Sequence, residues 1–423
     1  MQLMKHQIEA LEETKQFNRC AYYYDMGLGK TYIGSEKAMQ LHKSILVICQ
    51  KSKMQDWINH FNNNYDNVMV YDLSKKCNAE LMQFVDELYK ATSYIQVGVI
   101  NYDLAFRRSS LTKLNDFTLV LDESSLIQNE TAKRSKFILN KLNPTNVILL
   151  SGTPVSGKYE QLWSQCKLLG WDISKKLFYR QYVVYELSNE GYPIIIGYKN
   201  VERLKRKIRE YGAVFKKTEE VIDLPQQMFI DIKVAETKEY KQFRKDSIIT
   251  INDKTLVGDT TLTNLLYQRM LCGSYNENKL DAFKDLLEST NDRIIVFYNF
   301  NEELFKLKSI CEELNKPVSI VNGAVKDLNA YDVSRNSITL VQYQAGAYGL
   351  NLQEANKIIY FTPPLSTELF EQSKKRIHRI GQDKPCFYYQ LKCGIEYHIY
   401  DVLATKRDYT DALFIEHQEQ KGE

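Results

Sequence analysis

Residues 27–31 read Gly-Leu-Gly-Lys-Thr, a combination suited to holding a polyphosphate. The two glycines let backbone N–H groups approach phosphate oxygens, and the start of a helix predicted from residue 30 to about 41 adds a positive dipole. Lys30 supplies a point charge for the outer phosphates, and the Thr31 hydroxyl can ligate magnesium. The usual pattern has a further glycine where this chain has Tyr24, so an ordinary glycine turn before a helix is the alternative.

A carboxylate pair, Asp122 and Glu123, comes directly after the apolar residues 117–121. One carboxylate at a strand end can hold magnesium, and a second can orient or deprotonate an attacking water. An adjacent Asp-Glu pair also arises by chance in a chain with 53 acidic residues. The apolar strand before the pair and the phosphate loop upstream favour the catalytic interpretation.

The sequence Ser151-Gly152-Thr153-Pro154 follows another apolar run, residues 146–150. All four residue types suit a plain turn, so the tetrapeptide alone is a weak signal. Its position gives it weight, because it ends a strand that we expect to neighbour the strand leading to Asp122.

Three polar residues, Gln372, Arg376 and Arg379, are spaced at i, i+4 and i+7 in a helix predicted over residues 367–379. This spacing predicts that they share one helical face. Arginine is the preferred cation for charge developing on a transferred phosphate, and these residues belong to a separate predicted lobe. The alternative is a solvated charged face.

The elements that position these residues alternate between strand and helix, which indicates parallel sheets with helical crossovers. Ligands bind at the carboxyl edge of such sheets. We therefore predict an α/β fold with two lobes, each a mainly parallel sheet with flanking helices, and a partly helical connector. The predicted strands span residues 20–24, 44–49, 94–100, 117–121, 146–150, 227–234, 293–297, 317–321, 337–341 and 357–361. The predicted domains span residues 1–157, 158–273 (the connector) and 274–423, and the last ends in a C-terminal helix.

Composition narrows the class of protein. The 423 residues are 44% hydrophobic and 26% charged, with a net charge of +3, so a nucleic-acid surface would have to be a local patch. The eight cysteines form no C-x-x-C pair, which favours reduced intracellular thiols over zinc or disulfides. No apolar run has the length of a membrane span. We expect a cytoplasmic protein with no membrane partner.

Taken together, the motifs resemble superfamily 2 helicases with two RecA-like lobes, and most closely the Swi/Snf branch of double-stranded DNA translocases. DMGLGKT (25–31) resembles the phosphate loop of the branch, and VLDES resembles its DExx box. SGTP resembles the coupling motif, while AGAYGLNLQEA (345–355) and QSKKRIHRIGQ (372–382) resemble the fifth and sixth motifs. The likeness runs from residue 7 to about 403 in the family order.

The resemblance implies a nucleic-acid-stimulated ATPase that uses ATP and magnesium. Its implied nucleotide-binding residues are Gln7, Met26, Gly27, Leu28, Gly29, Lys30, Thr31 and Gly349. Its implied catalytic residues are Lys30, Asp122, Glu123, Gln372, Arg376 and Arg379, in a cleft between the lobes. Thr31 and Asp122 would hold magnesium, and Ser151 and Thr153 would couple hydrolysis to movement.

DNA is the partner that the resemblance implies, with duplex favoured over single-stranded DNA, and replication or recombination proteins are expected as further partners. The implied backbone contacts lie at strand-end loops: Lys51, Ser52, Asn101, Tyr102, Asn322, Gly323, Gln344 and Gly346. Such contacts are mainly to phosphates. For Tyr102, core packing is an equal alternative.

The chain departs from the family pattern at Ser125, where a histidine is common, and at Ala347, where glycine is usual. The large family insertions are missing, which suggests a minimal motor similar to stand-alone bacterial and phage copies; in a phage, its compartment would be the host cytoplasm. Two other functions stay open. One is an RNA-directed superfamily 2 helicase, and the other is a module that binds ATP and nucleic acid without productive turnover.

Overall fold

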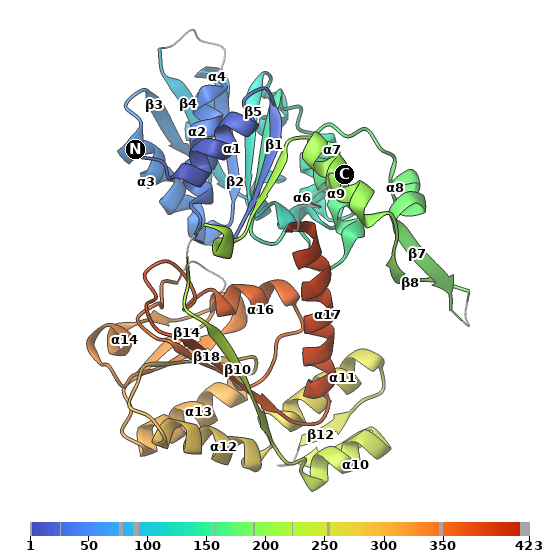
Figure 1. Cartoon of the computed structure of the whole chain (residues 1–423), viewed down its shortest axis with the longest axis vertical. Coiled ribbons are helices and arrows are strands. Elements are labelled where there is room, and N and C mark those ends of the chain that lie inside the picture. Colours follow the sequence, from blue (N-terminus) through green and yellow to red (C-terminus); the bar gives the residue numbers. More distant parts are fainter. Residues whose placement is uncertain are drawn as a thin grey trace, which may run out of the picture. The chain divides into compact units, whose positions relative to one another are not determined.

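The computed structural model describes residues 2–25, 27–75, 79–87, 93–155, 157–188, 191–221, 223–251, 254–346 and 350–414. The chain divides into two compact units (Figure 1). Unit 1 comprises Met1–Val221 and Arg407–Glu423, and unit 2 comprises Ile222–Lys406. The domain boundaries predicted at 157 and 273 lie inside these units, and the predicted connector is shared between them.

Unit 1 is organised around a seven-stranded parallel sheet with strand order β3-β4-β2-β5-β6-β1-β9. Its strands are β1 (Arg19–Tyr24), β2 (Ser44–Cys49), β3 (Val68–Asp72), β4 (Ile95–Asn101), β5 (Phe117–Asp122), β6 (Asn146–Ser151) and β9 (Ala213–Lys216). The central strands are continuous apolar runs because a parallel sheet is covered on both faces. The five strands predicted in this unit are confirmed close to their predicted bounds.

Helices cover this sheet. The helices of unit 1 are α1 (Lys5–Glu13), α2 (Lys30–Gln40), α3 (Met54–Asn64), α4 (Ala79–Glu87), α5 (Tyr102–Ala105), α6 (Lys133–Asn140), α7 (Trp163–Leu168), α8 (Lys175–Tyr182) and α9 (Val201–Glu210). Helix α2 lies so close to β6 that a Cβ at Gly34 would meet Leu150 Cδ1 at 2.7 Å. The missing side chain at Gly34 therefore lets α2, and with it the phosphate loop, sit against the sheet.

The part of unit 1 expected to be a connector contains an antiparallel hairpin, β7 (Val183–Leu187) and β8 (Pro193–Tyr198). Figure 1 shows this hairpin extending away from the sheet. The sequence predicted only a partly helical connector here. Strand β9, which follows α9, joins the main sheet beside β1, so this part of the chain does contribute to a sheet.

Unit 2 contains a second seven-stranded sheet, with order β10-β18-β17-β13-β16-β14-β15. All of its pairings are parallel except β14 with β15. Its strands are β10 (Gln227–Lys233), β13 (Ile294–Tyr298), β14 (Val318–Val321), β15 (Lys326–Asp327), β16 (Ile338–Gln342), β17 (Lys357–Tyr360) and β18 (Cys386–Lys392), and a separate hairpin joins β11 (Ile248–Ile251) to β12 (Lys254–Val257). The predicted fold of two mainly parallel sheets with flanking helices is therefore confirmed.

Alternate residues of β13 point to opposite faces of the second sheet, as the period of a strand requires. Ile294 and Val296 pack in one core with α12 (Glu277–Glu288) and α13 (Asn301–Glu313). Ile295 and Phe297 pack in another with α16 (Thr367–Lys374) and the first turns of α17 (Glu396–Phe414). The remaining helices of the unit are α10 (Lys238–Asp246), α11 (Thr261–Cys272), α14 (Asn329–Val333) and α15 (Tyr343–Gly346).

Within the described residues, no helix is both long and apolar enough to cross a membrane. The seven cysteines in this part of the chain are free thiols, and all are buried.

Candidate nucleotide-binding site

The phosphate loop connects β1 to α2 at the carboxyl edge of the first sheet. Gly27 and Gly29 have φ of 90° and 72°, a left-handed backbone that favours glycine. A Cβ at Gly29 would also meet Gln7 Nε2 at 2.3 Å, whereas a Cβ at Gly27 would meet no atom within 4 Å. Gly29 caps α2, so the loop leads directly into a helix N-terminus. This is the geometry that an anionic ligand requires.

Lys30 and Gln7 hold the loop together in this structure. The Lys30 ammonium donates to the carbonyls of Tyr24 (2.9 Å) and Asp25 (3.3 Å). The Gln7 amide donates to the carbonyls of Leu28 (3.1 Å) and Gly29 (3.3 Å). Gln7 is only 3% exposed, so its amide bonds the loop itself here, and its role in binding the nucleotide stays a prediction.

A residue that we did not single out anchors the loop from the other side. The Asp25 carboxylate accepts hydrogen bonds from the backbone N–H (3.2 Å) and the hydroxyl (3.3 Å) of Thr218. Thr218 begins the 3-10 turn Thr218–Glu220 after β9. The turn after β9 is thereby fixed to Asp25, the first residue of the DMGLGKT motif.

Asp122 ends β5 with a buried carboxylate that another part of the fold orients. Trp57, on α3 and 1% exposed, donates its indole N–H to Asp122 Oδ2 at 2.9 Å. Tyr102 donates its hydroxyl to the Asp122 carbonyl at 3.0 Å. Burial raises the pKa of the Tyr102 hydroxyl well above its ordinary value, so it stays a donor. The side chain and the backbone of Asp122 are therefore each held in place.

Glu123 has an unusual backbone. Its φ of 56° and ψ of 60° lie in the left-handed region, which is rare for a residue with a side chain. Strain of this kind is typical of functional sites, because the surrounding structure has to maintain it. Glu123 stands between the end of β5 and the 3-10 turn Ser124–Ile127.

Strand order brings the motifs of unit 1 to one edge. Strand β6 lies between β5 and β1, so the predicted pairing of the SGTP strand with the Asp122 strand is confirmed. At the end of β6, Ser151 Oγ accepts from the Thr153 backbone N–H at 3.1 Å. The phosphate loop, the SGTP turn and the carboxylates thus follow three consecutive strands of the sheet.

The predicted DNA contacts of unit 1 follow the next strands along the same edge. Lys51 and Ser52 are exposed on the turn after β2, as a phosphate contact requires. Asn101 is 6% exposed at the end of β4. Tyr102 is 3% exposed and its hydroxyl is engaged beneath Asp122, so the core-packing alternative describes it, and we withdraw it as a DNA contact.

The corresponding residues of unit 2 also follow neighbouring parallel strands. Asn322 and Gly323 come after β14, and Gln344 and Gly346 lie on α15 directly after β16. Asn322 Oδ1 accepts from two backbone N–H groups of its own turn, and Gly323 and Gln344 are exposed. Two of the residues predicted to bind nucleotide, Met26 and Gly349, lie outside the described residues.

The predicted helical face of Gln372, Arg376 and Arg379 is wrong. Helix α16 ends at Lys374, and only Gln372 lies on it. The chain then turns inward, so that Arg376 is 1% exposed and donates to the Leu350 carbonyl at 3.4 Å. Arg379 donates to the Asn351 side chain, and burial lowers the pKa of its guanidinium.

Gln382, the last residue of RIGQ, holds the segment that follows α16. Its amide donates to the carbonyls of Gln353 (3.0 Å), Ala355 (2.9 Å) and Ile377 (3.2 Å). These bonds draw the residues after α16 onto the segment before β17, and Ile377 is fully buried. The spacing of Gln372, Arg376 and Arg379 could not reveal this arrangement, because an argument from spacing assumes that the helix continues through all three residues.

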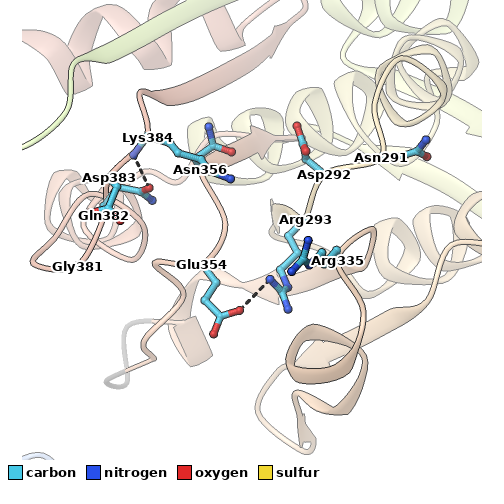
Figure 2. A pocket seen from close by; sticks show the side chains of 10 residues that line it. All are labelled: Asn291, Asp292, Arg293, Arg335, Glu354, Asn356, Gly381, Gln382, Asp383 and Lys384. Carbon is cyan, nitrogen blue, oxygen red and sulfur yellow. Dashed lines mark hydrogen bonds and ion pairs between the residues drawn. The ribbon is translucent and has the colours of Figure 1, made fainter.

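A polar pocket of about 540 Å³ lies in unit 2, away from the carboxyl edge (Figure 2). Residues immediately before β13, β17 and β18 line it, so it opens at the amino edge of the sheet. Its Arg293 forms an ion pair with Glu354 at 2.8 Å, and a second lining residue, Asp292, pairs with Lys357 at 2.6 Å. Because it opens at the amino edge, opposite the strand ends that carry the motifs, the pocket has no part in the site described above.

Trp57 offers a test of how Asp122 is held. Trp57→Phe keeps an aromatic ring beside Phe61 but removes the N–H, and a hydrogen bond to a charged group is worth about 1.5–3 kcal/mol. We expect the Mg²⁺ concentration for half-maximal ATP hydrolysis to rise roughly tenfold. The matched control is Trp163→Phe, because Trp163 donates to a backbone carbonyl, that of Ile173. Equal magnesium dependence in both variants would contradict this role of Trp57.

Comparison with known families identifies the family of the chain. The chain matches the SNF2-related domain over residues 8–278 and the helicase conserved C-terminal domain over residues 278–381. The first match alone covers more than half of the chain. The chain therefore belongs to the SNF2-related family, and the resemblance seen in its motifs is confirmed.

Relatives in this family are much longer than this chain. It is 24% identical over 415 residues to the yeast (Saccharomyces cerevisiae) ISWI chromatin-remodeling complex ATPase ISW1, covering 87% of this chain and 36% of the relative. It is 23% identical over 468 residues to the yeast DNA repair and recombination protein RDH54, covering 90% of this chain and 48% of the relative. The chain thus spans between about a third and a half of these relatives. A solved structure, the Sulfolobus solfataricus SWI2/SNF2 ATPase core in complex with dsDNA, is 21% identical with a TM-score of 0.44, over 97% of this chain and 92% of that chain.

Proposed function

We propose that this chain is a nucleic-acid-stimulated ATPase that couples ATP hydrolysis to movement along DNA, with duplex DNA as its track. The proposal rests on one observation: the phosphate loop, the SGTP turn and Asp122–Glu123 follow three neighbouring strands and so lie at the same edge of the first sheet. Membership of the SNF2-related family supports it. The roles of the relatives, a chromatin-remodeling ATPase and a DNA repair and recombination protein, support DNA as the partner.

ATP fits this edge as the substrate. The left-handed glycines and the N-terminus of α2 suit its phosphates, and Lys30 lies at the mouth of the loop. Thr31 and Asp122 are the residues that would hold magnesium, which when bound neutralises phosphate charge. Trp57 engages Asp122 Oδ2, and Oδ1 accepts no hydrogen bond from any described residue, so a ligand oxygen is available. Glu123 is the base that would accept a proton from the attacking water.

DNA would be bound through its backbone by residues at the carboxyl edges of the two sheets. Lys51, Ser52 and Asn101 are the proposed contacts in unit 1, and Asn322, Gly323, Gln344 and Gly346 in unit 2. Five of these seven residues have polar side chains and two are glycines, which suits contacts to phosphate oxygens that carry no sequence information. The free buried thiols support a reducing intracellular compartment, and the recombination role of one relative supports replication or recombination proteins as further partners.

Displacement of a third strand from duplex DNA tests translocation directly. If the chain moves along duplex DNA, ATP hydrolysis should release a triplex-forming oligonucleotide placed in its path. Two controls should leave the triplex intact: a non-hydrolysable ATP analogue in place of ATP, and the Glu123→Gln variant. ATP hydrolysis stimulated by DNA without triplex release would contradict movement along duplex DNA.

The two arginines after α16 should respond differently to removal. Arg379→Ala is expected to leave ATP affinity within a few-fold of wild type and to lower DNA-stimulated hydrolysis on the order of 10³-fold, as for an arginine that stabilises the transferred phosphoryl. Arg376→Ala should instead lower the melting temperature, because Arg376 is buried against the Leu350 carbonyl. Thermal unfolding, together with the basal and the DNA-stimulated rates of ATP hydrolysis, distinguishes the structural role of Arg376 from the catalytic role of Arg379. Full stimulation in Arg379→Ala would contradict its catalytic role.

A further inference from the structure

One fully buried amide connects three of the segments described above. Gln165 lies on α7 and is 0% exposed. Its Oε1 accepts hydrogen bonds from Ser124 Oγ (2.8 Å) and Tyr23 OH (3.0 Å), and its Nε2 donates to the Pro154 carbonyl (2.7 Å). Ser124 follows Glu123, Tyr23 belongs to the strand before the phosphate loop, and Pro154 ends SGTP.

The chemistry of the three partners fixes the orientation of this amide. Two hydroxyls converge on one end and a carbonyl faces the other. A carbonyl cannot donate, so a flipped amide would set Oε1 against the Pro154 oxygen. Burial raises the pKa of the Tyr23 hydroxyl well above its ordinary value, so Tyr23 remains a donor. Gln128 also donates to the Pro154 carbonyl, at 3.3 Å.

We propose that Gln165 is a positioning residue that links the SGTP turn to the segment of Glu123, so that a displacement of either is transmitted to the other. The inference rests on the proposed ATPase function. The link is direct, because Gln165 bonds the residue adjacent to Glu123, whose left-handed backbone has to be maintained by its surroundings. At the other end, Ser151 and Thr153 are bonded within the same turn as Pro154.

A buried polar network stabilises the fold when all of its hydrogen bonds are made, and a group left without a partner costs free energy of folding. Gln165→Leu has similar volume but leaves the Ser124 and Tyr23 hydroxyls without their acceptor, and it leaves the Pro154 carbonyl only the longer bond from Gln128. We expect this variant to bind ATP within about threefold of wild type and to lose DNA stimulation of kcat by roughly tenfold or more, since residues along a coupling route change coupling without contacting the ligand. The matched control is Gln96→Leu on β4, because Gln96 is also buried (2% exposed) and its amide lies 3.8 Å from Met69 Sδ, which belongs to none of the motifs.

Gln165→Glu gives a pH-dependent readout, and the melting temperature over the same pH range separates it from a loss of stability. A buried carboxyl has a raised pKa, and its protonated form can donate to the Pro154 carbonyl while accepting from both hydroxyls. Stimulated hydrolysis in this variant should therefore approach wild type at low pH and fall as pH rises through that pKa. Wild type and Gln96→Glu should not show this fall.

The experiment compares the full chain with these variants across pH 5.5–8.5. It measures the basal and the DNA-stimulated rate of ATP hydrolysis, the affinity for ATP and the melting temperature. The proposal is overturned if Gln165→Leu retains stimulation, if Gln96→Leu loses it equally, or if Gln165→Glu follows the wild-type pH profile. A wild-type chain without nucleic-acid-stimulated hydrolysis would instead refute the proposed function itself, and the two failures are therefore distinguishable.

Discussion

Lys30→Ala should abolish ATP turnover. Lys30 is the first residue of α2, and its ammonium lies on the carbonyls of Tyr24 and Asp25, at the mouth of the phosphate loop. These weak acceptors can be exchanged for the outer phosphates of ATP, which carry full negative charge. Alanine leaves the loop backbone and the helix dipole but no cation, and uncompensated phosphate charge then opposes both binding and transfer.

The measurement is steady-state ATPase together with direct nucleotide binding. Lys43→Ala is the matched control, because Lys43 pairs with Asp116 at the surface and should behave as wild type. Both variants should show a normal thermal transition. Near wild-type turnover in Lys30→Ala would mean that residues 27–31 are an ordinary glycine turn.

Glu123→Gln should separate ATP binding from hydrolysis. The amide has nearly the same shape as the carboxylate but cannot accept a proton from the attacking water. We expect ATP affinity within a few-fold of wild type and turnover lower by on the order of 10²–10⁴-fold, the usual contribution of a general base. The left-handed backbone at residue 123 is unaffected by this change, since both side chains tolerate it equally.

Glu130→Gln is the control for Glu123→Gln, because the Glu130 carboxylate pairs with Lys175 and has no catalytic role in this account. ATP affinity by fluorescence titration and phosphate release by single turnover give the two quantities. If ATP binding disappears in Glu123→Gln, Glu123 is a structural residue or a primary magnesium ligand instead.

Much of the fold could be predicted because buried parallel strands are continuous apolar runs. Strands β2, β5, β6 and β13 are such runs, and each was placed to within a residue or two. Strands β3, β9 and β18 were missed. They are partly exposed or alternate in burial, and β18 pairs with β10, which is distant in the sequence, so local pattern does not reveal them.

The site residues likewise divide into those that the sequence could predict and those that it could not. Contiguous motifs could be predicted, because Gly-Leu-Gly-Lys-Thr and Asp122–Glu123 carry their chemistry in adjacent residues. Trp57, Thr218 and Gln165 could not, since each is a single residue brought to a motif by the fold. The helix after residue 367 was predicted too long for a related reason: the segment that follows it is held by bonds from Gln382 to Gln353 and Ala355, which precede the helix.

The central claim is that hydrolysis at the edge of the first sheet is governed by duplex DNA. The most direct test is the ATPase rate of the full chain without nucleic acid and with single-stranded DNA, duplex DNA or RNA at equal phosphate concentration. We predict a low basal rate and the largest stimulation by duplex DNA, falling as salt is raised because phosphate contacts dominate binding. Greatest stimulation by RNA would indicate an RNA-directed helicase, and ATP-dependent binding of nucleic acid without turnover under any condition would indicate a non-hydrolysing module. Either result would contradict the account.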